Sequence, residues 1–155
     1  LTPAQPVADL ALKDLEGQPF DILAGSKHWR ILIPGFADCN QQCMETLYLT
    51  RQVHTRLSEK ANRVHRYYLT VDGGISESLK KTMADDYPYL KVASVSQEDF
   101  NAFIAKGSLA GTEGIENRYF IMDQEGFVMM SYTPAHSGNE LLTDIKRLLR
   151  YSYEE

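Results

Sequence analysis

The two cysteines of this chain lie four residues apart, where a predicted strand gives way to a predicted helix. Residues 31–44 begin with an apolar run typical of a buried strand, continue through a Pro-Gly turn, and then carry Cys39 and Cys43. A strand, a tight turn and a helix in direct succession are typical of a sheet covered by helices. Both sulfurs fall directly before or inside the start of the helix, and we predict the functional site there.

The spacing of the two cysteines permits a disulfide. If both residues were helical, their Cα atoms would be roughly 6.2 Å apart on nearly one face, which is inside the range for disulfides. The bond closes most easily if Cys39 lies in the turn before the first helical residue. A ring of about five residues stabilises a fold by about 2 kcal/mol at most in the chain-entropy model, so a purely structural bridge is a poor use of this spacing.

The expected position of Cys39 also alters its reactivity. Free N–H groups and the positive end of the helix dipole lower the pKa of a thiol near the first turn. Asp38 opposes this effect by like-charge repulsion, although we expect Asp38 mainly to cap the helix. Cys43 falls inside the apolar arc of the helix, so we expect an accessible Cys39 and a shielded Cys43. The alternative is two ordinary small core residues.

Length and composition indicate one globular domain over residues 1–155. Of these residues 43% are hydrophobic and 24% are charged, and no internal repeat is visible. A net charge of -5 without a basic stripe argues against nucleic acid or an anionic membrane surface as a partner. The chain begins with Leu1 rather than Met, so we expect a trimmed product from which an upstream signal or membrane anchor is missing.

Predicted strands and helices alternate along the chain. The first half contains a hairpin over 7–22, a strand over 29–33, a helix over 40–59 and a strand over 63–72. A helix capped by Ser76 and a strand over 90–95 follow, and then a helix that starts at a capping box at Ser96 and stops at Gly107. The chain ends with a hairpin of 118–122 and 127–132, which turns at Gly126, and a helix that starts at a capping box at Ser137. This order predicts a thioredoxin-like three-layer α/β/α fold with a mixed central sheet, an N-terminal β-hairpin, and a C-terminal β-hairpin plus helix.

The motif Gly35-Phe36-x-x-Cys39-x-x-x-Cys43 after an apolar strand resembles the copper-site motif of the Sco/SenC proteins. These are thioredoxin-like assembly factors for the copper centre of cytochrome c oxidase. The similarity extends through Leu69-Thr70-Val71-Asp72 and Phe120-Ile121-Met122-Asp123 to the last helix. The resemblance implies a periplasmic or extracytoplasmic protein, membrane-tethered at full length. It also implies protein thiols or disulfides as partners, such as those of an oxidase subunit or a copper chaperone, and we expect a monomer.

This chain departs from the Sco pattern, and also from the thioredoxin pattern. Sco proteins usually have a proline after each cysteine, where this chain has Asn40 and Met44. Their copper-binding histidine falls near residues 114–116, and no histidine is present there. Thioredoxins place a cis-proline in the same region, and residues 107–117 contain no proline. The chain is therefore identified as a divergent member without the usual third copper ligand.

The four histidines offer no obvious replacement. His54 is roughly 16 Å beyond Cys43 along a continuous helix, and we expect it to be packed or hydrogen-bonded. His65 lies within a strand, and His28 lies at the opposite end of the core strand from the cysteines. His136 lies in the loop before the last helix, and it alone has a route to the site through a mobile loop.

Three functions remain open. The first is thiol–disulfide exchange during respiratory oxidase assembly, with Cys39 attacking, Cys43 resolving the mixed disulfide, and no cofactor required. The second is a Cu(I)-binding chaperone with Cys39 and Cys43 as metal ligands, because soft thiolates suit Cu(I). Met44 is expected to fill a gap in the core rather than to bind copper. The third is a non-catalytic assembly scaffold. A peroxidase is excluded because Phe36 stands where such sites need a hydroxyl.

Overall fold

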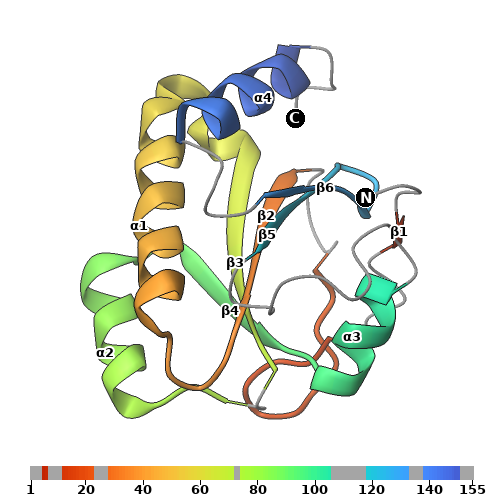
Figure 1. Cartoon of the computed structure of the whole chain (residues 1–155). Coiled ribbons are helices and arrows are strands. Elements are labelled where there is room, and N and C mark those ends of the chain that lie inside the picture. The colour runs from red at the N-terminus through yellow and green to blue at the C-terminus, as the bar shows by residue number, and fades with distance from the viewer. Residues whose placement is uncertain are drawn as a thin grey trace.

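Six strands form one mixed sheet in the order β1-β6-β5-β2-β3-β4 (Figure 1). The computed structural model describes residues 5–6, 12–22, 28–71, 74–105, 118–132 and 138–150. Strands β2, β3 and β4 are parallel, whereas the β2–β5, β5–β6 and β6–β1 pairs are antiparallel. The elements are β1 (Gln5–Pro6), β2 (Trp29–Gly35), α1 (Gln41–Arg56), the 3-10 helix η2 (Ser58–Arg63), β3 (Val64–Thr70), α2 (Glu77–Asp86), β4 (Leu90–Ser94), α3 (Gln97–Ala105), β5 (Tyr119–Met122), β6 (Phe127–Tyr132) and α4 (Gly138–Arg150).

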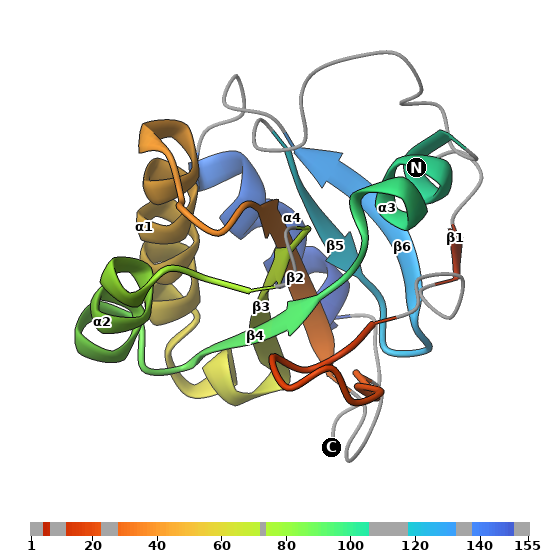
Figure 2. The same cartoon turned by 90° about the horizontal axis from the view of Figure 1, so that it is seen from below.

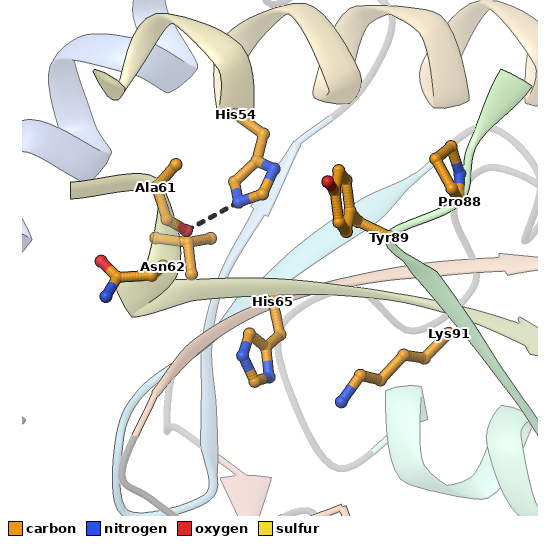
Figure 3. Close-up of a pocket in the computed structure, with 8 residues that line it drawn as sticks. His54, Ala61, Asn62, His65, Pro88, Tyr89 and Lys91 are labelled. Carbon is orange, nitrogen blue, oxygen red and sulfur yellow. Dashed lines mark hydrogen bonds between the residues drawn. The ribbon is translucent and has the colours of Figure 1, made fainter. Parts of the chain in front are cut away.

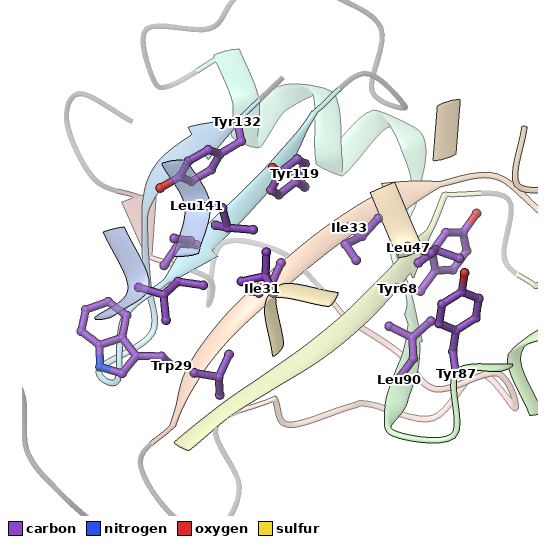
Figure 4. Packing of buried hydrophobic residues seen from close by; sticks show 14 of the residues in the cluster. Trp29, Ile31, Ile33, Leu47, Tyr68, Tyr87, Leu90, Tyr119, Tyr132 and Leu141 are labelled. Carbon is purple, nitrogen blue, oxygen red and sulfur yellow. The ribbon is translucent and has the colours of Figure 1, made fainter. Parts of the chain in front are cut away.

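Helices cover both faces of the sheet. Helices α1, α2 and α4 lie on one face and α3 lies on the other (Figures 1 and 2). Alternation along β2 separates two cores, because Ile31 and Ile33 pack with Leu47 of α1, whereas Leu32 packs with Phe100 of α3. Figure 4 shows the first of these clusters. The predicted three-layer α/β/α thioredoxin-like fold is confirmed.

Of the predicted N-terminal hairpin, the structure describes residues 12–22, which form a turn closed by one β-bridge. Lys13 bridges Pro19, and the turn closes where the Gly17 N–H donates to the Asp14 carbonyl at 3.1 Å, with Gly17 at a φ of 86°. Lys13 also bridges Ser94, which ties the turn to β4. Most of the predicted first strand lies outside the described residues. The pairing of β1 with β6 was not predicted.

The ends of β2 and α1 differ from the prediction for identifiable reasons. Strand β2 continues through Pro34 to Gly35 instead of ending at Ile33, because its parallel ladder with β3 runs to the pair of Gly35 and Thr70, whereas its ladder with β5 covers only Arg30 to Leu32. Beyond Leu32 the β5 ladder no longer needs an N–H from β2, so a proline is tolerated. Helix α1 ends at Arg56 rather than near residue 59, since Ser58 adopts a left-handed φ of 54° and the chain continues as a 3-10 turn.

The predicted caps and the closing turn are confirmed where the structure describes them. The Ser76 hydroxyl accepts the Leu79 N–H at 3.1 Å, and the Ser96 hydroxyl accepts the Asp99 N–H at 3.0 Å. Gly126 has a φ of 96°, as the hairpin turn requires. The helix stop at Gly107 and the capping residue Ser137 lie outside the described residues.

Candidate functional site

Cys39 and Cys43 form a disulfide at the carboxyl end of the central strand β2. Their Cα atoms are 5.3 Å apart, shorter than the separation expected for two helical residues. Helix α1 starts at Gln41 with Asn40 as its N-cap, so Cys39 precedes the helix as predicted. Cys43 is only 1% exposed, whereas Cys39 is partly exposed at the edge of the same core. The sulfur of Cys39 is therefore the more accessible to a partner.

Asn40 caps the N-terminus of α1 with its side chain. Its Oδ1 accepts the Cys43 N–H at 2.8 Å, and its carbonyl accepts the Met44 N–H at 2.8 Å. The prediction that Asp38 caps the helix is wrong, because the extended backbone required at the cap occurs at Asn40 and Asp38 is exposed. The first turn of α1 contains no acidic residue. The positive helix end therefore favours a Cys39 thiolate once the disulfide is reduced.

Tyr68 is a site residue that the sequence pattern did not predict. Its hydroxyl oxygen lies 3.8 Å from Cys43 Sγ, and its O–H donates to the Phe36 carbonyl at 2.6 Å. Disulfide sulfur carries no hydrogen, so the sulfur–oxygen approach is a contact in the oxidised protein and can become an S–H···O bond after reduction. The parallel register places Tyr68 opposite Ile33, on the α1 face of the sheet (Figure 4).

Gly35 makes room for this tyrosine. A Cβ atom at Gly35 would overlap the hydroxyl and ring carbons of Tyr68. The segment after Gly35 is fixed by two further hydrogen bonds, from the Val71 N–H to the Gly35 carbonyl at 2.9 Å and from the Ser76 N–H to the Ala37 carbonyl at 2.8 Å. The polypeptide leading into Cys39 is thus held by β3 and by the start of α2.

The three described histidines lie far from the disulfide along the sheet. His28 precedes β2, as expected, and its ring stacks on that of His65 with centroids 3.9 Å apart. His54 lies near the end of α1, with Nε2 2.7 Å from the Ala61 carbonyl oxygen. His136 lies outside the described residues, as do residues 107–117, which include the position of the copper-binding histidine in the Sco pattern.

The donor set at the site is two sulfurs. Among the described residues no group of three or more His, Cys, Asp and Glu side chains is placed to hold a metal ion. Met44 is half-buried and packs against the α1-face core, as predicted. Two reduced thiolates fit Cu(I), which accepts few soft ligands, better than they fit Cu(II).

Comparison with protein families assigns this architecture. Residues 29–152 match the family described as transmembrane-like, thioredoxin-like, C-terminal domain. The chain belongs to this family. Comparison with curated protein sequences gives no match. Within the described ranges, no helix of this thioredoxin-like domain combines the length and the apolar character needed to cross a membrane.

Solved Sco structures share the fold of this thioredoxin-like domain. Arabidopsis thaliana ScoI with copper bound is 17% identical, covers 92% of this chain and 97% of its own, and has a TM-score of 0.68. Yeast Sco1 with copper bound is 17% identical, with coverages of 93% and 92% and a TM-score of 0.69. A SCO1/SenC family lipoprotein from Bacillus anthracis is 18% identical, with coverages of 89% and 91% and a TM-score of 0.64. The Sco/SenC resemblance is confirmed at the level of the fold.

Proposed function

We propose that this domain exchanges electrons with partner proteins through the dithiol and disulfide forms of Cys39 and Cys43. The observation that carries the proposal is the asymmetry of the pair, with a partly exposed sulfur before a helix N-terminus and a buried sulfur inside it. A structural staple gains nothing from that asymmetry, whereas exchange needs one sulfur that a partner reaches and one that it does not.

The reductive half-reaction uses both sulfurs in turn. The Cys39 thiolate attacks one sulfur of a partner disulfide, forms a mixed disulfide and releases a partner thiolate. The Cys43 thiolate, formed as its thiol loses a proton, then attacks Cys39 Sγ and releases the second partner thiolate. Two electrons pass to the partner, and Cys39 and Cys43 become a disulfide. The oxidative direction is the reverse of these steps.

The process, partners and location that we propose for this domain follow from its structural similarity to Sco proteins. The fold shared with Sco proteins supports a role in assembling the copper centre of a respiratory oxidase, where cysteines must be reduced before metal is delivered. The partners are then cysteines of an oxidase subunit or a copper chaperone. The Bacillus anthracis relative is a lipoprotein, which supports an extracytoplasmic, membrane-tethered location for the full protein.

The reduction potential of the pair tests the proposal. The protein is equilibrated in glutathione buffers, and its free thiols are trapped and counted by mass spectrometry. We expect a potential between about -270 and -120 mV, the range of exchange proteins. A potential below about -300 mV would indicate a stable structural bridge and overturn the proposal.

Trapping of the mixed disulfide tests the two roles separately. With oxidised glutathione, a Cys43→Ser variant should retain glutathione on Cys39, whereas a Cys39→Ser variant should react much more slowly because Cys43 is buried. Cys43→Ala keeps the core apolar and serves if the serine variant folds poorly. Equal labelling of both single variants would contradict the assignment of Cys39 as the attacking sulfur.

Cu(I) carriage by the reduced pair is the second candidate. It is favoured by the two-sulfur donor set and by the bound copper in the ScoI and Sco1 structures. Titration of the reduced protein with Cu(I), against a chromophoric chelator, should then show one tightly bound ion that either Cys→Ser change removes. Absence of stoichiometric binding would eliminate this candidate while leaving exchange intact.

A further inference from the structure

A pocket of about 530 Å³ lies at the end of the sheet opposite the disulfide (Figure 3). It is lined by Val64 and His65, which pair with Trp29 and Arg30 at the start of β2, whereas the cysteines follow the end of β2. The β3–β4 ladder begins only at Arg66. The first residues of β3 therefore have no paired strand on that side, and this leaves the space that the pocket occupies.

The pocket has mainly apolar walls with a few basic groups. Val64, Pro88 and the ring of Tyr89, which is 78% exposed, provide the apolar surface. The pocket is also lined by His54, His65 and Lys91, and Figure 3 shows His54 on one side of the β3 ribbon and His65 and Lys91 on the other. Within the described part of the chain, no residue that lines the pocket is Asp or Glu, and no carboxylate forms an ion pair with Lys91. The polar groups of this pocket are thus suited to an anion.

The groups around His65 are mainly basic. The pKa of His65 is lowered to about 4, first by burial and then by the neighbouring basic groups His28, Lys91, Arg30 and His54. Among the residues that the structure describes, no acidic group contributes to this shift. Lys91 and Arg30 are the permanently charged residues of this set, so an anion in the pocket would lie near positive charge although the protein has a net charge of -5.

We propose that this pocket binds a small organic anion with a flat apolar body, an aromatic carboxylate, with its ring against Tyr89 and its carboxylate at Lys91 and His65. The pocket volume lies within the range of small-molecule sites, which combine apolar walls with a few polar groups that fix orientation. This site is separate from the disulfide and independent of the exchange reaction.

The probes that test the proposal are 2-naphthoate and its neutral analogue 2-naphthamide. Each is titrated into the full, oxidised chain and followed by amide resonances in two-dimensional NMR. Naphthoate should shift the amide resonances of Val64, His65, Tyr89 and Lys91. It should bind about fivefold more tightly than naphthamide, because its negative charge is attracted to one nearby positive charge in a water-exposed site. Binding of naphthoate should also raise the pKa of His65, and binding of naphthamide should not.

Matched lysine variants isolate the charge. Lys91→Gln should bring naphthoate binding close to that of naphthamide, whereas Lys81→Gln, with the same charge change on α2, should leave both unchanged. Tyr89→Ala should weaken the binding of both probes. Equal affinity of the two probes for the unmodified protein, an unchanged His65 pKa in the naphthoate complex, or resonance shifts confined to other regions would overturn the proposal. The absence of any resonance shift at millimolar concentrations of naphthoate would also overturn the proposal.

Discussion

The hydroxyl oxygen of Tyr68 lies 3.8 Å from Cys43 Sγ, although 25 residues separate the two in sequence. The tyrosine donates its own hydrogen to the Phe36 carbonyl, so its oxygen remains able to accept a hydrogen bond. Only the reduced form of Cys43 has a hydrogen to give. We therefore expect Tyr68 to stabilise the reduced protein relative to the oxidised one.

Replacing Tyr68 by phenylalanine should make the disulfide harder to reduce. Loss of one weak S–H···O bond, worth roughly 0.5 kcal/mol, lowers the reduction potential by about 10 mV. The measurement is redox equilibration of Tyr68→Phe beside Tyr67→Phe, whose side chain packs on the other face of the sheet and should leave the potential unchanged. A higher potential in Tyr68→Phe would show that the hydroxyl favours the disulfide instead.

Gly35→Ala should destabilise the domain because the added methyl group overlaps the buried tyrosine ring. We expect a loss of about 1 to 3 kcal/mol in the free energy of unfolding, the usual range for overpacking. Gly74→Ala is the matched control, since a Cβ there meets nothing within 4 Å. Urea denaturation of the oxidised proteins measures both changes. Equal effects of the two substitutions would mean that the Tyr68 ring moves aside freely.

Substitutions of Asn40 separate helix capping from thiol activation. Asn40→Ala removes the acceptor for the Cys43 N–H and should lower stability by about 1 kcal/mol. Asn40→Asp keeps the cap but adds a negative charge beside Cys39, which raises the pKa of that thiol. Iodoacetamide should therefore alkylate reduced Asn40→Asp more slowly than the parent at pH 6, with little loss of stability. Unchanged alkylation rates would show that the local charge does not control Cys39.

The pKa of His65 makes stability depend on pH. Its value of about 4 in the folded protein lies below the ordinary 6.5, so protons bind the unfolded chain preferentially between these values. Stability should fall as the pH drops through this window and level off below it. Because the side chain is partly exposed, we expect about 1 kcal/mol between pH 7 and pH 5.

His65→Phe tests this pH dependence, because it keeps a ring against His28 and removes the titration. Its unfolding free energy should vary less between pH 7 and pH 5 than that of the parent. Lys91→Met should raise the His65 pKa, as followed by NMR, because it removes a neighbouring cation. The same pH dependence in His65→Phe and the parent would rule out His65 as its source.

Much of the fold could be predicted because its signals are local. The Ser76 cap, the glycine turn at Gly126 and the apolar stripe of α4 each depend on residues a few positions apart. Strand β1 could not be predicted, since two residues that include a proline show no periodicity. The extension of β2 through Pro34 depends on where its β5 ladder stops, which no local pattern records.

The candidate site also has features that the local sequence predicts and features that it does not. The order of Cys39 before the helix and Cys43 within it follows from helix geometry. Asp38 and Asn40 are both good capping residues, and the choice between them rests on which one takes the extended backbone. The contact of Tyr68 with Cys43 depends on the register of β3 against β2, a long-range property.

In the proposed exchange reaction, the buried Cys43 sulfur and the partly exposed Cys39 sulfur are surrounded by two different sets of side chains. Residues around Cys39 decide which molecules gain access. Tyr68 contacts the buried Cys43 sulfur, and Gly35 leaves room for the Tyr68 ring, so these two residues bear on the stability of the reduced form rather than on access to the site. Selectivity and driving force can therefore be altered independently of each other in this domain.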